Sequence, residues 1–152
     1  MENRKIINAT PTKVGNIAFK SKLEASIYKA LRAEGLNPKY EQHKFVIWEG
    51  FKPSIPFYER NKRTKSIVPN NKKVMDITYT PDFSFAWNGY TVFVEAKPEG
   101  FTNDVYPYKQ KLFRKYMETN MPNIKPIFVK VGTIKGLKEF IDILKHTFNE
   151  KS

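Results

Sequence analysis

The chain has 152 residues, a length that suits one compact domain and is too short for two independent ones. Its 27 Lys and Arg residues outnumber its 15 Asp and Glu residues, and the formal net charge of +12 favours a polyanionic partner such as nucleic acid. The absence of cysteine excludes disulfides and thiolate metal sites. Since no signal-peptide pattern, long apolar run or basic amphipathic helix rich in Trp or Phe on its apolar side is present, we expect a cytoplasmic protein without a membrane partner.

The N-terminal part divides into an arm and a helix. Residues 1–17 are polar and lack sustained periodicity, which predicts a flexible basic arm ahead of a single domain over residues 18–152. From Ser21 onward, apolar residues recur at helical spacing until Gly35 supplies a stop. The sequence therefore predicts a first helix with the apolar positions Leu23, Ile27, Ala30 and Leu31.

The next part contains a strand and a long basic segment. Aromatic and β-branched residues over residues 40–48 predict a strand. Residues 50–73 contain several prolines and predict a long exposed excursion within the domain. Because of its positive charge, we expect this segment to contact DNA through Lys62, Arg63, Lys65, Lys72 and Lys73.

The remaining elements begin with a hairpin. Residues 74–87 and 90–97 have strand character and are separated by Asn88-Gly89, which is the strongest short-range hairpin signal. A helix over residues 106–118, a strand over residues 127–131 and a final helix follow. The final helix has an apolar stripe of Leu137, Phe140, Ile141, Leu144 and Phe148. The order α-β-β-β-α-β-α predicts a mixed α/β fold with a central sheet flanked by helices and an additional C-terminal helix.

Two acidic residues oppose each other across this hairpin. Asp82 and Glu95 are equidistant from the turn, so they share one sheet face with Cβ atoms about 4.5–5.5 Å apart, and Lys97 joins that face by strand alternation. Opposed like charges must hold a proton or bind a cation. Mg²⁺, or Mn²⁺ in its place, would relieve the repulsion, activate a water and polarise a phosphate. The pattern thus predicts metal-dependent phosphodiester hydrolysis, and the alternative is a solvated sheet face without catalytic function.

Glu24 has two interpretations. Its helical position lies in the same arc as Leu23 and Ile27, which directs it toward the sheet. Ser21-Lys22-Leu23-Glu24 also fits a capping box, in which Ser21 and Glu24 satisfy the helix start locally. The pattern alone favours capping.

The helix over residues 106–118 carries further candidate DNA contacts. Its basic flank is formed by Lys111, Arg114 and Lys115, while its packing side is formed by Leu112, Phe113 and Tyr116. The flank either contacts phosphates or is simply solvated, and the charge excess leaves these alternatives balanced. Lys109 falls on the packing side and either extends to solvent or reaches a phosphate bound beside Glu95. We expect His43 and His146 to be surface residues without a metal partner.

The acidic motif resembles that of a nuclease superfamily. Pro81-Asp82 followed by Glu95-Ala96-Lys97 resembles the PD-(D/E)XK signature, and the element order resembles its restriction-endonuclease-like αβββαβ core. Over residues 19–97, the succession of motifs resembles the phage endonuclease I family of Holliday-junction resolvases. These motifs are Phe19-Lys20-Ser21-Lys22-Leu23-Glu24, Tyr40-Glu41, Thr78-Tyr79-Thr80-Pro81-Asp82-Phe83, Asn88-Gly89 and Val94-Glu95-Ala96-Lys97.

The resemblance implies specific roles and partners. Glu24, Asp82, Glu95 and Lys97 would be catalytic, and Glu24 would contribute to the metal site rather than only to a cap. The metal would be held by Glu24, Asp82, Glu95 and the carbonyl of Ala96. Branched DNA, a homodimer and, for a phage-encoded protein, the cytoplasm of a bacterial host are also implied.

Two features depart from that family. Residues 50–73 are longer than expected, and Pro98 follows Lys97 where a glycine is usual. These departures leave the substrate open. A restriction-like or transposon-type nuclease acting on linear duplex and a catalytically inactive basic DNA-binding module remain as alternatives.

Overall fold

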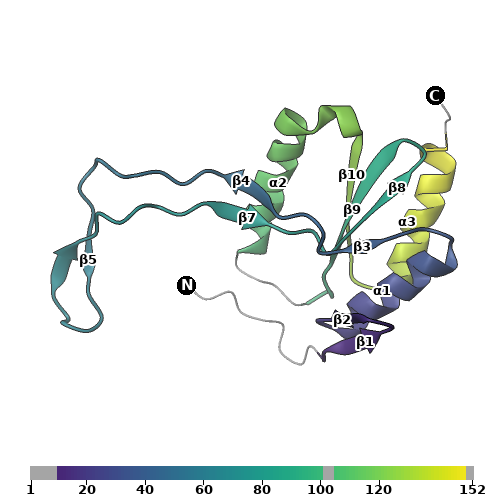
Figure 1. Cartoon of the computed structure of the whole chain (residues 1–152), viewed down its shortest axis with the longest axis horizontal. Helices are drawn as coiled ribbons and strands as arrows, with labels where there is room; N and C mark the ends of the chain where they lie inside the picture. The colour runs from purple at the N-terminus through teal and green to yellow at the C-terminus, as the bar shows by residue number, and fades with distance from the viewer. Residues whose placement is uncertain (1–9, 101–104, 150–152) are drawn as a thin grey trace.

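A mixed four-stranded sheet forms the centre of the protein. The computed structural model describes residues 10–100 and 105–149. The strands lie in the order β10-β9-β8-β3 (Figure 1); β10 runs parallel to β9, and the other neighbours are antiparallel. Their bounds are Lys39–Tyr40 (β3), Phe83–Trp87 (β8), Tyr90–Ala96 (β9) and Pro126–Val131 (β10).

Helices cover both faces of this sheet. Helices α1 (Lys22–Ala33) and α3 (Ile134–Thr147) lie on one side, and α2 (Tyr106–Asn120), followed by a short 3-10 helix at Pro122–Ile124, lies on the other (Figure 1). The sheet and its helices follow the predicted order α-β-β-β-α-β-α, which confirms a mixed α/β fold. In the described part of the chain, no helix combines the length and apolar character that crossing a bilayer requires.

Strand alternation assigns the two faces to separate cores. Val92 and Val94 of β9 belong to the core beneath α1 and α3, whereas Phe93 belongs to the core beneath α2. Glu95 is two residues after Phe93 and therefore lies on the α2 side. The site described below thus occupies the sheet face that α2 covers.

The predicted helices are confirmed with small changes at their ends. The Ser21 Oγ accepts a hydrogen bond from the Glu24 N–H (3.1 Å), and Gly35 follows the last turn with a φ of 79°. Helix α2 continues to Asn120, two residues beyond the predicted end. The predicted apolar stripe of α3 is buried at Leu137, Phe140, Ile141 and Leu144.

The predicted hairpin register is also confirmed. Strands β8 and β9 pair from Trp87↔Tyr90 to Phe83↔Val94, and both turn residues, Asn88 and Gly89, have positive φ. The expectation of one continuous strand over residues 74–87 is wrong. Strand β7 (Ile77–Tyr79) ends before residues 80–82, because Pro81 has no N–H with which to continue a ladder.

The predicted strand over residues 40–48 is likewise two strands. Tyr40 ends β3, Glu41 adopts a φ of 46° that is incompatible with an extended ladder, and β4 (Phe45–Trp48) then pairs with β7 in a separate two-stranded sheet. This small sheet carries Ile47 and Tyr79 into the core beneath α2.

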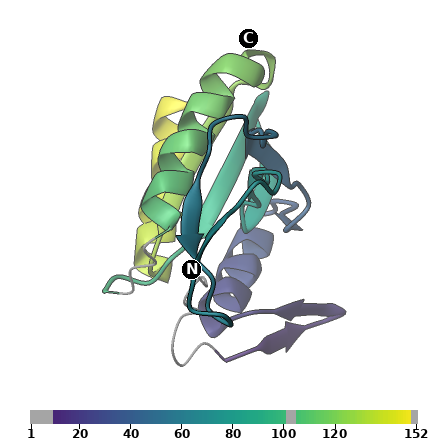
Figure 2. The same cartoon turned by 90° about the vertical axis from the view of Figure 1, so that its left-hand side faces the viewer.

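The N-terminal expectation is partly wrong. Residues 1–9 lie outside the described residues, but β1 (Thr12–Val14) and β2 (Ile17–Phe19) form a hairpin beside α1 (Figure 2). Gly15 supplies the left-handed turn with a φ of 59°, and Val14 and Ile17 pack against the core of α1 and α3. These apolar contacts explain why this segment has regular structure.

Residues 50–73 project away from the body (Figure 1). From here on, the arm means this segment and not the N-terminal residues 1–17. The predicted exposure of the arm is confirmed, but it contains an antiparallel pair, β5 (Tyr58–Arg60) and β6 (Ile67–Pro69), rather than only irregular chain. At the root, a Cβ on Gly50 would overlap the Val74 carbonyl oxygen, so only glycine permits the two backbones to approach so closely there.

Candidate active site

A pocket of about 310 Å³ opens on the α2 side of the sheet. It lies where β7, the irregular residues 80–82, the end of β9 and the start of α2 meet. The structure brings together three predicted catalytic residues here, Asp82, Glu95 and Lys97, with Lys109 of α2, which the sequence offered as a candidate phosphate contact. The remaining lining residues are Lys20, Thr78, Tyr79, Thr80, Val105 and Tyr106.

Asp82 is held by backbone groups on both sides. Its Oδ2 accepts a hydrogen bond from the Ala96 N–H (2.7 Å), and its carbonyl accepts one from the Glu41 N–H (2.9 Å). Asp82 follows Pro81 at the point where the β8 ladder stops, so its carboxylate replaces a strand carbonyl as the partner of Ala96. The position of this acid is therefore fixed by the sheet.

Glu95 is held by a buried tyrosine. The Tyr79 hydroxyl donates to Glu95 Oε1 (2.5 Å), and Tyr79 is only 5% exposed. Its ring packs against that of Phe113 in α2, with centroids 4.8 Å apart. The packing of α2 on the sheet thus sets the direction of the Glu95 carboxylate.

The negative charge of Glu95 disfavours ionisation of Asp82. Burial raises the pKa of Asp82 well above its ordinary value, and the negative charges of Glu95 and Glu24 raise it further, against the Ala96 hydrogen bond. Burial also raises the pKa of Glu95, although the hydrogen bond from Tyr79, the positive charge of Lys97 and the hydrogen bond with Asp82 oppose this. Such a pair either shares a proton or, once both carboxylates are ionised, requires a bound cation.

Lys97 supplies one of the positive charges of the pocket, beside Lys20 and Lys109. Burial lowers the pKa of its ammonium group, whereas the charges of Glu95 and Asp82 act in the opposite direction. Its Nζ lies 4.5 Å from the centroid of the Tyr106 ring. The hydroxyl of Tyr106 is buried close to Tyr79 and Gln110, so the aromatic side of the pocket also contains a polar group.

Glu24 combines features of both interpretations. Its N–H is capped by Ser21, but its carboxylate does not complete a capping box, since Oε1 instead accepts from the Lys20 N–H (2.9 Å) and the Tyr40 hydroxyl (2.8 Å). The side chain is 6% exposed and close enough to Asp82 to raise its pKa, yet it does not line the pocket. Across residues 10–100 and 105–149, no three His, Cys, Asp or Glu side chains form a group arranged to hold a metal.

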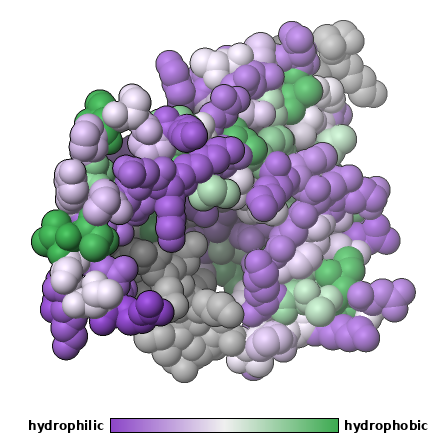
Figure 3. Space-filling model, turned by 60° about the vertical axis from the view of Figure 1, so that its left-hand side comes forward, coloured by the Kyte–Doolittle hydropathy of each residue, from purple (hydrophilic) through white to green (hydrophobic). Residues whose placement is uncertain are grey.

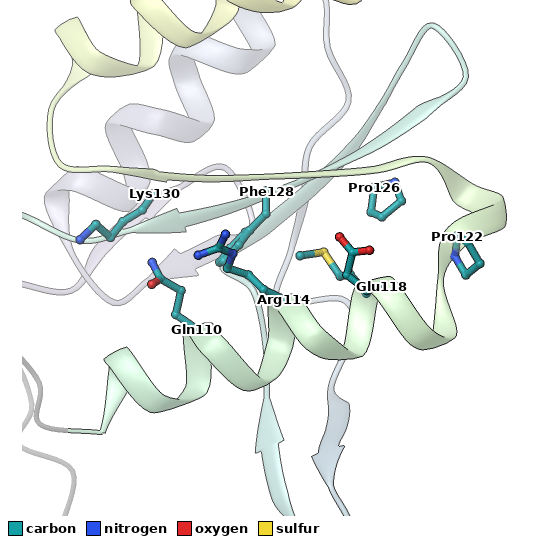
Figure 4. Close-up of a pocket in the computed structure, with 8 residues that line it drawn as sticks. Gln110, Arg114, Glu118, Pro122, Pro126, Phe128 and Lys130 are labelled. Carbon is teal, nitrogen blue, oxygen red and sulfur yellow. The ribbon is translucent and has the colours of Figure 1, made fainter.

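The predicted DNA-binding residues do not gather at one place. Lys111 and Lys115 are exposed on α2. The four predicted lysines and one predicted arginine of residues 50–73 are exposed along the arm, which projects away from the body (Figure 1). Arg114 lines a second pocket of about 510 Å³, where Gln110, Arg114 and Glu118 project from α2 toward Phe128 and Lys130 of β10 (Figure 4). His43 and His146 are exposed, as expected.

Sequence reasoning missed Tyr79, Tyr40 and Lys20 as parts of this site. In one continuous strand, Tyr79 and Asp82 would face opposite sides of the sheet because their numbers differ by three. The irregular residues 80–82 interrupt the alternation of side chains along the strand, so both side chains reach Glu95. The Pro81 position was the only signal of that change.

Replacing Tyr79 with phenylalanine is expected to destabilise the fold by about 1–2 kcal/mol, because Glu95 loses its buried donor while the ring packing remains. Chemical denaturation in EDTA measures this difference. Tyr116→Phe, on the same helix-packing side, is the matched control. An unchanged denaturation midpoint for Tyr79→Phe would show that the hydroxyl does not stabilise the carboxylate.

The fold and pocket together define a mixed α/β protein with a half-buried acid pair beside a lysine. The chain matches, over residues 4–130, the family described as "Protein of unknown function (DUF1064)", and it belongs to that family. No curated protein and no solved structure matches it.

Proposed function

We propose that this chain is a divalent-metal-dependent endonuclease that hydrolyses DNA phosphodiester bonds, with branched DNA as its preferred substrate. The observation that carries the proposal is the convergence of Asp82, Glu95 and Lys97 in one open pocket. The net charge of +12 supports a polyanionic substrate.

The donor set fits Mg²⁺ or Mn²⁺. Mg²⁺ is usually held by one or two carboxylates together with waters and substrate phosphate, so the Asp82 and Glu95 pair suffices without a complete protein cage. The Ala96 carbonyl is a further candidate, because its N–H already points at Asp82 and both groups of one strand residue point to the same side. Glu24, held by Tyr40 behind Asp82, would act on the ion through its negative charge or through a bound water.

The surrounding residues support hydrolysis of a phosphodiester. A bound divalent ion supplies Lewis acidity to the phosphate and lowers the pKa of a water. Lys97 donates to a phosphate oxygen and stabilises the negative charge that develops there. Tyr79 keeps the Glu95 carboxylate in place, and Lys109 offers a second cation at the pocket wall.

The sequence motifs add support for a nuclease. Pro81-Asp82 and Glu95-Ala96-Lys97 resemble the PD-(D/E)XK signature, and the element order α-β-β-β-α-β-α contains the αβββαβ order of that superfamily. The preference for junctions and the homodimer follow only from the resemblance to the endonuclease I family.

One assay tests reaction, cofactor and substrate together. Purified protein is incubated with a four-way DNA junction and a linear duplex of matched sequence, in Mg²⁺ and in EDTA. We expect Mg²⁺-dependent nicking that is faster on the junction. Lys97→Ala should slow it by about 10²–10³-fold, the usual effect of losing one group that stabilises transition-state charge, whereas Lys138→Ala on the exposed side of α3 should not.

The other outcomes identify the alternatives. Equal cutting of junction and duplex would favour a restriction-like or transposon-type nuclease. Absence of cleavage together with no calorimetric Mg²⁺ or Mn²⁺ binding would overturn the proposal in favour of a DNA-binding module without catalysis. Light scattering of the same samples tests the dimer.

A further inference from the structure

The arm is an ordered ribbon. Backbone bonds link Phe51 to Val74 in both directions (2.9 and 2.8 Å), and Asn70 donates to the Phe57 carbonyl (2.8 Å) just before β5 and β6 pair. At the tip, the Asn61 side chain accepts from the backbone N–H groups of Arg63 and Thr64 (2.9 and 3.0 Å). These bonds join the two segments of the arm at its root and at β5 and β6, and they order the turn at its tip.

Half of the net charge of the chain resides in the arm. Residues 50–73 contain seven Lys and Arg residues and one acidic residue, Glu59, so their net charge is +6 of the total of +12. Three of these cations, Lys62, Arg63 and Lys65, lie in the tip turn between β5 and β6. The charge of the arm is therefore complementary to a polyanion.

The two faces of the ribbon differ. Directly paired residues share a face, so Tyr58 and Pro69 lie with Arg60 and Ile67 on one side. The other side carries Glu59 and Val68, and Asn70 Nδ2 donates to the Glu59 carboxylate (3.2 Å). One face is thus apolar and basic, and the acid of the arm lies on the opposite face.

The apolar side chains of the arm are unusually exposed. Tyr58 is 60% exposed, Ile67 68% and Ile55 80%. Figure 3, in which the side of the molecule that bears the arm is turned forward, shows hydrophobic side chains in small groups among hydrophilic ones. Exposed apolar side chains that form a patch rimmed by polar residues mark an interaction surface.

The length of the arm matches a duplex repeat. Extended chain advances about 3.3 Å per residue, so roughly a dozen residues in each strand can reach up to about 40 Å, and one turn of B-form DNA is about 34–36 Å. The root lies beside the pocket, because β7, which pairs with β4 at the root, carries Thr78 and Tyr79 of the pocket lining. The tip can therefore reach a groove about one turn away from a phosphate at Asp82 and Glu95.

We propose that the arm inserts into the major groove of duplex DNA, about one helical turn from the bond held at the pocket, with Tyr58, Arg60 and Ile67 toward the bases. This inference rests on the proposed function for the position of the cut. A major groove about 12 Å wide admits a two-stranded ribbon, whereas the deep, narrow major groove of A-form RNA does not. A second copy of the chain fits less well, because it would bring another arm of net charge +6 against the first.

Fluorescence anisotropy in EDTA tests the arm without requiring cleavage. The probes are B-form duplexes of about 10 and about 30 base pairs, of which only the longer spans pocket and tip. The arm variant combines Lys62→Ser, Arg63→Ser and Lys65→Asn, since asparagine tolerates the positive φ at position 65. The matched control removes three exposed cations of α1 and α3 on the opposite side of the sheet, Lys29→Ser, Lys135→Ser and Lys138→Ser.

We expect wild type to bind the longer duplex more tightly than the shorter. The arm variant should bind the longer and the shorter duplex with similar affinity. Its slope of log K against log salt should decrease in magnitude by about 2–3, while the slope of the control variant changes by less than about 1. A second variant, Tyr58→Ser with Ile67→Ser, should weaken binding of the longer duplex several-fold at an unchanged salt slope. If the arm variant cleaves the short duplex at the wild-type rate, the arm contributes to DNA binding and not to the chemistry of the pocket.

Three results would overturn the inference. The first is an arm variant whose dependence of affinity on duplex length and whose salt slope are unchanged. The second is an equal loss of DNA affinity in the arm and control variants, and the third is an affinity for A-form RNA equal to that for B-form DNA. A loss of DNA binding that occurs only with a change from dimer to monomer in light scattering would assign the arm to self-association instead. If wild type cleaves no DNA, the anisotropy results still decide whether the arm binds it.

Discussion

Replacing Glu95 with glutamine is expected to lower Mg²⁺-dependent DNA cleavage by about 10²–10³-fold or more, because the pocket loses one of its two anionic oxygen donors. Glutamine has the same shape, and its carbonyl can still accept the hydrogen bond from Tyr79. The variant therefore separates loss of charge from loss of fold. Single-turnover nicking of a labelled junction measures the effect.

Asp82→Asn should cause a loss of similar size, since its amide oxygen can still accept from the Ala96 N–H while the charge is removed. Glu139→Gln on α3, which is exposed and on the other side of the sheet, is the matched control. Isothermal titration with Mn²⁺ should show weakened binding in both site variants. Cleavage by Glu95→Gln within tenfold of wild type would refute a role for this pair in holding the ion.

The second large effect concerns stability in the absence of metal. The folded-state pKa values of Asp82 and Glu95 are raised above their ordinary values of 3.8 and 4.5, so the folded chain binds protons more tightly than the unfolded chain. Stability from these groups is present at low pH and is lost as pH rises from about 4 through the folded-state values. At neutral pH without metal, we therefore expect this pair to destabilise the fold.

Asp82→Asn removes this cost and should raise Tm in EDTA at neutral pH. Each 1 kcal/mol of relief corresponds to about 2–4 °C in a domain of this length. The gain over wild type should shrink toward pH 4, where the wild-type acids are protonated. Mg²⁺ should raise the Tm of wild type more than that of the variant.

Thermal denaturation at several pH values, in EDTA and in Mg²⁺, measures these differences. Asp142→Asn on the exposed side of α3 controls for the general effect of one fewer acid on a chain of net charge +12. If the Tm difference between Asp82→Asn and wild type increases as the pH falls, the stated direction of the pKa shifts is contradicted.

Features that depend on neighbouring residues could be predicted from the sequence. Asn88-Gly89 determines a tight turn because both residues accept positive φ, and the turn determines the pairing of β8 with β9. That register placed Asp82 and Glu95 in the same pocket, as predicted. The helices were found for the same reason, since their caps and apolar stripes are local patterns.

The sequence by itself thus determined the mixed α/β class, the helices and the pair of opposed acids. Only the tertiary structure decided that Pro81 divides a strand, that Tyr79 and Tyr40 hold Glu95 and Glu24, and that the arm is a ribbon with one basic, apolar face. These features join residues far apart in the chain. A single residue that leaves the strand pairing also shifts the alternation, so that the residues before it face the opposite side of the sheet. Local pattern does not contain that information, because the contacts that select it form only when the sheet and helices pack.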